Sequence, residues 1–384
     1  MIGNIANIVL PLTNGLTDIQ RMMETNLDPL RVNMGGPAGI HALNAVLAIV
    51  MFGVALSIKP KDFVGIIKNP RSVIIGMVCQ LFLLPALTFL LTVVFKDILS
   101  PMVSLGMILV AACPGGNVSN FITSLCKGNS ELSVSLTAIN TVLSVITTPL
   151  NFSFWGGLYI RFSDSSIPGV LPELEIPLGD IFTTIFILLG IPLILGIFCA
   201  HYLPKLSLAL KKPLQYLSII FFIGMVAIAF TGNITVFMKC IGYIFIIVFV
   251  HNLLALGTGF GASTLLRTPY KDRRTITIET GIQNSGLGLA LLLNNKIFNK
   301  DLWAPEIITD ANGHQWAKET ITTLVENAAG VANEVTTTVL TDDFLGYGGM
   351  LVIVAWWGVW HIISGLSLAI SWKIRGRKED TANA

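Results

Sequence analysis

Long apolar stretches with few polar interruptions recur along most of the chain. A helix of about 20 apolar residues is long enough to cross a hydrocarbon core of about 30 Å. Read against breaks at proline, glycine and charged residues, the apolar stretches lie near residues 41–58, 72–95, 102–125, 130–152, 180–202, 213–231, 238–265, 275–298 and 347–372. The pattern therefore predicts about nine transmembrane helices in an all-α polytopic membrane protein.

The composition agrees with a chain surrounded by lipid. Of its 384 residues, 53% are hydrophobic and 12% are charged, and the mean hydropathy is +0.75. Soluble domains are about 25% charged. The five cysteines are scattered through the apolar stretches without metal-ligand spacing. This pattern argues against a disulfide framework and a metal centre.

Basic residues gather after every second predicted helix, at residues 59–71, 127, 205–212, 267–274 and 373–378. The long loops on the other side, residues 153–179 and 299–346, carry mostly Asp and Glu. The positive-inside rule then predicts a cytoplasmic C-terminus and an external N-terminus. We expect a multi-pass protein of the plasma membrane, which in a bacterium is the cytoplasmic (inner) membrane.

Two segments fall outside the helical pattern. In residues 1–38 the apolar run at 8–16 is too short to span, which predicts an amphipathic helix on the outer surface; a tenth span is the alternative. Residues 299–346 form an external acidic insertion whose interrupted apolar pattern cannot bury a core. We therefore expect a small cap or a partly disordered loop there.

The first polar interruption of a predicted helix is the sequence CPGGNVSN at residues 113–120. Proline removes a backbone donor and the two glycines loosen the helix, so the chain is expected to unwind here and to free carbonyl groups for coordination. A simple packing kink is the alternative, because Gly and Pro are common in membrane helices. The three polar side chains that follow within four residues favour a binding site.

The second interruption is ETGIQNSG at residues 279–286. A charged side chain at the bilayer centre costs about 2.5–3.5 kcal/mol on insertion scales. Glu279 is the carboxylate that the predicted helices place well inside the membrane, and no lysine or arginine lies at comparable depth. Its counter-charge is therefore expected to be a bound cation or a proton.

Polar residues also form a stripe on the predicted helix 130–152. They recur at steps of three and four, which places them on one helical face, and they are Ser133, Thr137, Asn140, Thr141, Ser144 and Thr148. The stripe is typical of a polar cavity wall, although each hydroxyl could equally bond to its own helix or join two helices. Gln80 is a lone amide within the second predicted helix and is by itself only weak evidence for a site. His251, Asn252 and His361 also lie within predicted helices, where an interhelical hydrogen bond explains each of them as well as a functional role does.

The two glycine-interrupted motifs lie in the third and eighth predicted helices, so they cross the membrane in opposite senses. This is the pattern of an inverted repeat. Half-helix N-termini would then face an anionic substrate, while carbonyl and side-chain oxygens hold a cation. The expected organisation is an external segment 1–38, a first repeat 39–152, an external loop 153–179, the first four helices of a second repeat 180–298, the insertion 299–346, a last helix 347–372 and a cytoplasmic tail 373–384.

The residues in these motifs also limit the chemistry. A site of Ser, Thr, Asn, Gln and one Glu is rich in hard oxygen ligands, which suits sodium better than a transition metal. Proton coupling through Glu279 is the rival interpretation. The sequence has no zinc-protease motif, phosphate loop or pair of intramembrane carboxylates, so we predict neither an enzyme nor a nucleic-acid partner.

The pairing of CPGGNVSN with ETGIQNSG resembles the bile acid:sodium symporter family, over about residues 40–298 and 347–372. The resemblance implies two inverted repeats that form a core and a panel domain, with two broken helices crossing in the core. It also implies two sodium ions that share Glu279. The first sodium site would comprise Ser119, Asn120, Ser133, Thr137 and Glu279. The second would comprise Gln80, Glu279 and Gln283 with the backbone carbonyls of Thr280 and Ile282.

The resemblance defines the substrate class less precisely than it defines the two sodium sites. The family carries bile acids, other organic anions and small carboxylates such as pantoate, and the positions that would face substrate are Asn117, Asn284 and His361. The chain departs from the family in lacking a clear first span, as the nine-span members do, and in its long insertion. We therefore expect a symporter that imports an organic anion with sodium by alternating access. The alternatives are a proton-coupled transporter, a passive channel or facilitator, and a receptor-like protein that senses a ligand through the insertion.

Overall fold

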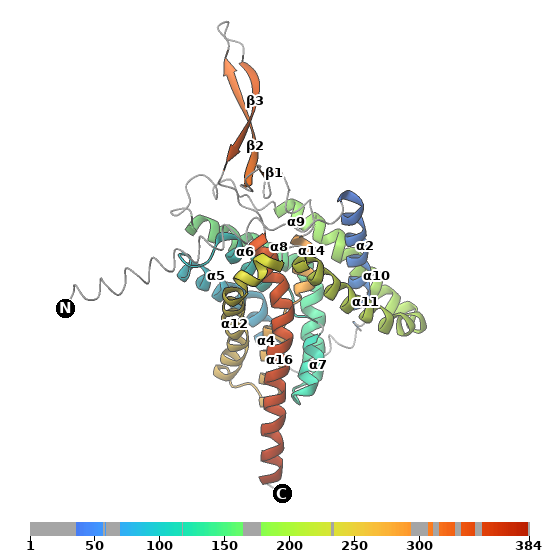
Figure 1. Ribbon diagram of the computed structural model, residues 1–384. Coiled ribbons are helices and arrows are strands. Elements are labelled where there is room, and N and C mark those ends of the chain that lie inside the picture. Colours follow the sequence, from blue (N-terminus) through green and yellow to red (C-terminus); the bar gives the residue numbers. More distant parts are fainter. Residues whose placement is uncertain are drawn as a thin grey trace, which may run out of the picture.

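The computed structural model is mainly helical, with a small β-sheet at one end (Figure 1). It describes residues 36–56, 58, 70–116, 118–163, 178–231, 234–292, 306–309, 315–326, 332–341 and 348–382. The predicted amphipathic helix within residues 1–38 lies almost entirely outside this described part. The helices follow the chain in the order α2 (Gly36–Ala55), α4 (Pro70–Val78), η2 (Cys79–Leu83, a π-helical turn), α5 (Leu84–Val94), α6 (Pro101–Ala112), α7 (Val118–Leu125), α8 (Ser130–Ser163), α9 (Leu178–Ile185), η3 (Phe186–Gly190, also π-helical), α10 (Ile191–Tyr202), α11 (Pro204–Thr231), α12 (Ile234–Leu265), α13 (Tyr270–Gly281), α14 (Ser285–Leu292) and α16 (Gly348–Ala382).

Every predicted apolar range overlaps one of these helices or a consecutive group of them. Among the described residues, four helical segments are long and apolar enough to cross a membrane: Pro70–Val94, Ser130–Ser163, Cys240–Leu265 and Gly348–Ile374. Shorter apolar helices cover Asn44–Ala55, Pro101–Ala112 and Phe186–Tyr202. The chain is thus a multi-pass membrane protein, while the count of nine spans stays a prediction.

Several helices extend beyond their predicted bounds. Helix α8 continues to Ser163, α11 begins at Pro204 and α13 begins at Tyr270. Hydropathy marks only the apolar part of a helix, whereas the backbone hydrogen bonds that define it continue through polar turns. The longer α13 matters for the site, because it brings Asp272 into the same helix as Glu279.

A proline explains the π-helical turn in the segment that carries Gln80. Pro85 has no backbone N–H, so the carbonyl of Leu81, four residues earlier, loses its helical partner. The side-chain amide of Asn151 on α8 donates to that carbonyl at 3.0 Å. The irregular turn η2 therefore places Gln80, which is buried, at a locally rearranged point of the helix, as is frequent for functional residues.

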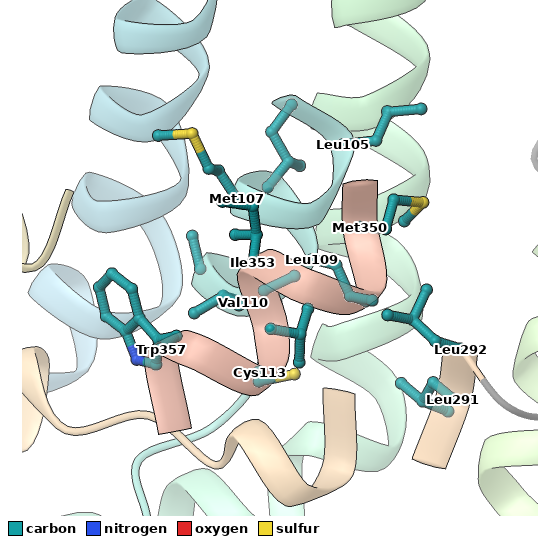
Figure 2. Close-up of a cluster of buried hydrophobic side chains, with 14 of the residues drawn as sticks. Leu105, Met107, Leu109, Val110, Cys113, Leu291, Leu292, Met350, Ile353 and Trp357 are labelled. Atoms are coloured by element: carbon teal, nitrogen blue, oxygen red, sulfur yellow. The ribbon is translucent and has the colours of Figure 1, made fainter. Parts of the chain in front are cut away.

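The largest apolar core lies between α6, α14 and α16. Every residue of α6 is buried, and Figure 2 shows Leu105 and Leu109 of α6 beside Met350 and Ile353 of α16. A Cβ atom at Gly106 would lie 2.7 Å from Met350 Cα, so the two helices approach at a distance that only glycine allows. This packing holds the first broken helix against α16.

Helices α2, α10 and α11 lie together on one side of the molecule (Figure 1). A Cβ atom at Gly196 of α10 would lie 2.4 Å from the Ala55 Cβ of α2. Ala55 and Leu193 also pack against Ala138 on α8. This face of α8 is apolar, whereas the face that carries Ser133 and Thr137 turns toward α13.

The insertion forms strands, which the sequence analysis did not predict. Strands β1 (Glu306–Thr309), β2 (Gln315–Glu326) and β3 (Ala332–Thr341) make an antiparallel sheet in the order β1-β2-β3, with Thr320 opposite Thr338. The expectation of an all-α chain was therefore wrong for these residues, whereas the interpretation of the insertion as a small external cap stays a prediction. The strands are rich in Thr, Val and Ile, and β-branched residues of this kind are enriched in β-sheets.

Candidate functional site

The two broken helices meet at their breaks. Helix α6 ends at Ala112 and α7 begins at Val118, while α13 ends at Gly281 and α14 begins at Ser285. Between them two short extended segments pair antiparallel, with Gly115 opposite Gln283. The Gly116 N–H donates to the Ile282 carbonyl at 2.9 Å, and the Asn284 N–H donates to the Pro114 carbonyl at 2.8 Å. The predicted unwinding is confirmed at both motifs.

Local sequence explains the first break. Cys113 precedes a proline and adopts an extended conformation, with φ −72° and ψ 153°, because a following proline disfavours the helical region. The two glycines then allow close approach, since a Cβ atom at Gly116 would lie 3.1 Å from the Gln283 carbonyl oxygen. The crossing therefore requires backbone without side chains at this point.

Glu279 lies on α13 at the crossing and is buried, with 2% of its surface exposed. Ser119 of α7 donates to its Oε1 at 2.7 Å, Ser133 of α8 donates to the same oxygen, and Thr137 of α8 donates to Oε2 at 3.0 Å. Within the described part of the chain these hydroxyls are its partners, and no lysine or arginine pairs with it. A buried carboxylate without a cationic side chain calls for another counter-charge.

Asn120 completes the first predicted sodium site. Its Oδ1 lies 2.9 Å from Ser133 Oγ and 3.4 Å from Thr137 Oγ1, beside the two hydroxyls of α8 that donate to Glu279. The structure thus brings together all five residues predicted for this site, from three helices. Each hydroxyl oxygen that donates to Glu279 keeps lone pairs that can face a cation.

In the second predicted site, the side-chain amides of Gln80 and Gln283 bond to each other. Gln80 Nε2 donates to Gln283 Oε1 at 2.7 Å, and Gln283 Nε2 lies 3.3 Å from Gln80 Oε1. Gln283 Nε2 also donates to the Thr280 carbonyl at 2.8 Å, and Gln80 Nε2 to the Cys113 carbonyl at 3.0 Å. Gln80, Thr280 and Gln283 therefore lie together, with their oxygens engaged by amide hydrogens.

The remaining members of the second predicted site lie on its border. The Ile282 carbonyl accepts from Gly116 in the crossing rather than from a glutamine. A Cβ atom at Gly115 would lie 3.2 Å from Glu279 Oε2 and 3.8 Å from the Ile282 carbonyl oxygen. Gly115 thus lies between the Glu279 carboxylate and the Ile282 carbonyl group.

The polar stripe on α8 is buried along its whole length. Part of it bonds locally, because Ser144 Oγ donates to the Thr141 carbonyl at 2.7 Å. Asn140 behaves differently: both its amide nitrogen and its amide oxygen are buried without a partner in the described residues, as is the hydroxyl of Thr148. The stripe therefore combines hydroxyls that serve the helix with groups available to water or a ligand.

The three predicted substrate residues have different surroundings. Asn117 lies outside the described residues. Asn284 is half-buried, and its Oδ1 accepts from the Leu287 N–H at 3.1 Å, so it caps the N-terminus of α14. His361 is buried on α16, and its Nδ1 has no partner among the described residues.

Several supporting residues escaped the sequence analysis or were left without a role. Asn252 Nδ2 donates to the Gly281 carbonyl at 2.9 Å, and Ser364 donates to Asn252 Oδ1. His251 Nε2 lies 2.9 Å from Thr88 Oγ1. The interhelical interpretation of these two α12 residues is therefore confirmed. The available signal was a polar residue inside an apolar helix, which cannot identify its partner.

The site can be compared with known proteins. A sequence profile of the Sodium Bile acid symporter family matches residues 44–240. The uncharacterized sodium-dependent transporter YocS of Bacillus subtilis (strain 168) is 34% identical over 245 residues, which are 64% of this chain and 71% of that protein. The ileal sodium/bile acid cotransporter of Homo sapiens is 31% identical over 247 residues, or 64% and 67% of the two chains. Sodium/bile acid cotransporter 4 of Homo sapiens is 29% identical over 267 residues, or 66% and 56%.

Proposed function

This chain belongs to the sodium bile acid symporter family, and we propose that it is a symporter that imports an organic anion together with sodium by alternating access. It is a multi-pass membrane transporter and not an enzyme. The observation that carries the proposal is the buried Glu279 carboxylate, whose partners are hydroxyl groups contributed by α7 and α8.

The first site has the chemistry that sodium requires. The Glu279 carboxylate supplies one negative charge, and the hydroxyls of Ser119, Ser133 and Thr137 surround it with oxygen. A monovalent cation would leave the site neutral, which suits a buried position. The hydroxyls and the Asn120 amide oxygen argue for sodium over a proton, because a proton alone would need no ring of oxygen ligands.

A second sodium would use the amide pair. Turning the Gln80 and Gln283 amides so that their oxygens face inward would add two neutral ligands beside the carbonyls of Thr280 and Ile282. In the present geometry the two amides satisfy each other. We propose that sodium replaces this pairing and that Glu279 serves both ions, which would couple their occupancy.

The crossing also supplies a place for an anion. Helices α7 and α14 both begin at the crossing, at Val118 and Ser285, so their positive dipole ends face it. Asn284 lies at the start of α14, Asn117 directly precedes Val118 in the sequence, and His361 is on α16, which packs beside α14. We propose that a bile acid-like or small carboxylate anion binds here, next to the sodium ions.

Alternating access would move two rigid parts past each other. The crossing joins α6, α7, α13 and α14 through backbone hydrogen bonds, while α2, α10 and α11 lie to one side (Figure 1). We propose that these groups belong to the core and panel domains of two inverted repeats, and that the core moves. The basic tail of α16 would be cytoplasmic and the sheet external; the two lie at opposite ends of the molecule (Figure 1).

Sodium-dependent thermal stabilisation of the purified protein tests this function. The melting temperature is measured in sodium and in potassium for the wild type, Glu279→Gln and Gln283→Ala. Binding to the native state stabilises it, so sodium should raise the wild-type melting temperature and Glu279→Gln should abolish the rise. Stabilisation that follows pH and ignores sodium would favour proton coupling, and no ligand response at all would favour a passive pore. Uptake of radiolabelled taurocholate and pantoate in sodium or potassium then tests the substrate class.

A further inference from the structure

We propose that Asp272 is a positioning residue that sets the register of α13 against α8 and α4, and through it the geometry of both sodium sites. The inference rests on the proposed sodium coupling. Asp272 lies in the first turn of α13 and is 5% exposed, far less than expected for a charged residue at the end of a membrane helix. Among the described residues its hydrogen bonds go to Ser72 and Asn129 and to none of the predicted ligands, so any effect on sodium passes through the helices.

One carboxylate connects three separate segments. Ser72 Oγ of α4 donates to Asp272 Oδ2 at 2.6 Å, and Asn129 Nδ2 donates to Asp272 Oδ1 at 2.8 Å. Both oxygens of the carboxylate are therefore engaged by neutral donors, in the short geometry typical of charge-assisted hydrogen bonds. Such bonds are directional and hold the two partner helices against α13.

The Asn129 contact fixes the start of α8. Asn129 Oδ1 accepts from the Leu132 N–H at 3.1 Å, which makes this residue the N-cap of the helix. Its own N–H donates to Thr275 Oγ1 on α13 at 2.8 Å. The Asn129 N–H also donates to the Lys271 carbonyl at 3.3 Å, and the Asn129 carbonyl oxygen lies 3.2 Å from Thr275 Oγ1. The side-chain contact with Asp272 and these contacts with Lys271 and Thr275 together fix the position and the rotation of the helix start. Ser133 and Thr137 follow at one and two turns.

The contacts of Asp272 lie about two helical turns from the predicted sodium ligands, along the same pairs of helices. Asp272 and Glu279 are seven positions apart on α13, about two turns and roughly 10 Å along one face. Asp272 contacts Asn129 at the start of α8, and two turns further along α13 Glu279 contacts Ser133 and Thr137 of the same helix. Likewise Ser72 lies eight positions before Gln80, and Gln80 meets Gln283. Asp272 therefore holds α13 against α8 and against α4 at one end. The first predicted sodium site lies further along the first pair of helices, and the second site lies further along the other pair.

Nearby arginines are occupied elsewhere. Arg274 Nη1 donates to the Cys126 carbonyl at 2.7 Å, and its guanidinium lies 4.3 Å from the centroid of the Tyr270 ring. Arg71 Nη2 donates to the Leu266 carbonyl at 2.6 Å. The hydrogen bonds of Asp272 to Ser72 and Asn129 thus remain its distinctive contacts. The ligands of a binding site must be held within about 0.5 Å of their binding geometry, which requires hydrogen bonds of this kind between the helices that carry them.

The experiment measures half-saturating sodium separately from stability. Melting temperatures of the wild type and Asp272→Asn are recorded in potassium and across a sodium titration. Residues that act on a binding site without touching its ligand typically change affinity by about two- to thirtyfold, so half-saturating sodium should rise by about fivefold or more. The matched control is Thr277→Val, on the same helix between Asp272 and Glu279. Thr277 Oγ1 bonds only within α13, to the Arg273 carbonyl at 2.7 Å, so its loss should leave half-saturating sodium unchanged.

A reciprocal exchange provides the rescue. In the double variant Asn129→Asp with Asp272→Asn, the new amide at position 272 would donate to the new carboxylate at position 129 and still accept from Ser72 Oγ. Aspartate caps helices as well as asparagine does. Half-saturating sodium should then return to within about threefold of the wild type, roughly 0.6 kcal/mol, a recovery that a merely destabilising role does not predict.

The outcomes separate this inference from the proposed function. A wild type without any sodium response overturns both. A wild-type response that Asp272→Asn retains at unchanged half-saturating sodium, even with a lower melting temperature in potassium, overturns only the positioning role of Asp272. If Asp272→Asn does not fold, Ser72→Ala removes one of the two hydrogen bonds. It should shift half-saturating sodium in the same direction by a smaller factor, and no shift would again overturn the role.

Discussion

Gly115 lies directly beside the carboxylate of Glu279. A Cβ atom at Gly115 would lie 3.2 Å from Glu279 Oε2 and 3.4 Å from the Glu279 carbonyl oxygen. The first distance is shorter than an ordinary van der Waals contact, and the second involves backbone that cannot rotate away. The absent side chain at position 115 therefore lets the two broken helices cross next to a buried charge.

This contact predicts the effect of a single methyl group. Gly115→Ala should displace the Glu279 carboxylate and raise half-saturating sodium by about tenfold or more, as for other changes next to a metal ligand. The control is Gly157→Ala on α8, where an added Cβ meets no atom within 4 Å. Helical Ala is favoured over Gly by about 0.5–1 kcal/mol, so the control should melt no lower than the wild type. Sodium titration of the melting temperature checks both, and unchanged half-saturation in Gly115→Ala would contradict the geometry.

Thr137 should contribute to sodium affinity through its hydroxyl. Thr137→Val keeps the shape of the side chain but removes the donor to Glu279 Oε2 at 3.0 Å. The variant loses an oxygen ligand and a group that orients the Glu279 carboxylate, and loss of such an orienting partner typically lowers metal affinity about 10–100-fold, so sodium affinity should fall by about tenfold or more. Thr147→Val on the same helix removes only a local bond to the Leu143 carbonyl and should have little effect. Equal sodium titrations of the two variants would exclude Thr137 as a ligand.

Gln80 should govern how steeply uptake depends on sodium. Gln80→Met removes the amide that pairs with Gln283 and with the Cys113 carbonyl while keeping a similar length. With the second site lost, initial uptake plotted against sodium concentration should become less steep, while sodium still stabilises the protein through the first site. Met77→Leu, one turn earlier on α4, is the matched control. An unchanged curve for Gln80→Met would place the second ion elsewhere.

Asn252 should contribute to stability more than to ion binding. Its Nδ2 donates to the Gly281 carbonyl at the end of α13, and its Oδ1 accepts from Ser364. Asn252→Leu leaves buried polar groups unpaired, which costs about 1–3 kcal/mol, so the melting temperature should fall in potassium and in sodium alike. Thr258→Val, which loses only a bond to the Leu254 carbonyl within α12, should melt closer to the wild type. A loss confined to sodium would instead assign Asn252 to the site.

The sheet should be dispensable for ion binding. Strands β1 to β3 pair with one another, whereas the candidate sodium ligands lie on helices and at the crossing. Replacing residues 306–341 by a short Gly/Ser linker should therefore preserve sodium stabilisation and uptake. The control is a second variant in which residues 306–341 keep their number and composition but stand in scrambled order. Loss of uptake with retained sodium stabilisation would point to a role of the sheet in substrate recognition or gating.

The sequence by itself determined where the helices break and which charge is buried. Pro114 followed by two glycines weakens the helix at this point, because the missing donor and the absent Cβ atoms are local properties, although Pro149 inside α8 shows that a proline alone does not end a helix. Glu279 in an apolar stretch predicted a charge that needs a partner. The hydroxyl stripe containing Ser133 and Thr137 was likewise visible as a helical period. These features depend on the chain alone, and the crossing in the structure agrees with them.

Only the tertiary structure decided which groups meet. Glu279 and Ser119 are 160 positions apart, and Asp272 and Ser72 are 200 positions apart. Apolar periodicity cannot choose between neighbours, because lipid and a packed helix are equally apolar surroundings for a helix face. The role of Asp272 was hidden for the same reason: its polar partners on two other helices, and not its own sequence context, allow it to be buried.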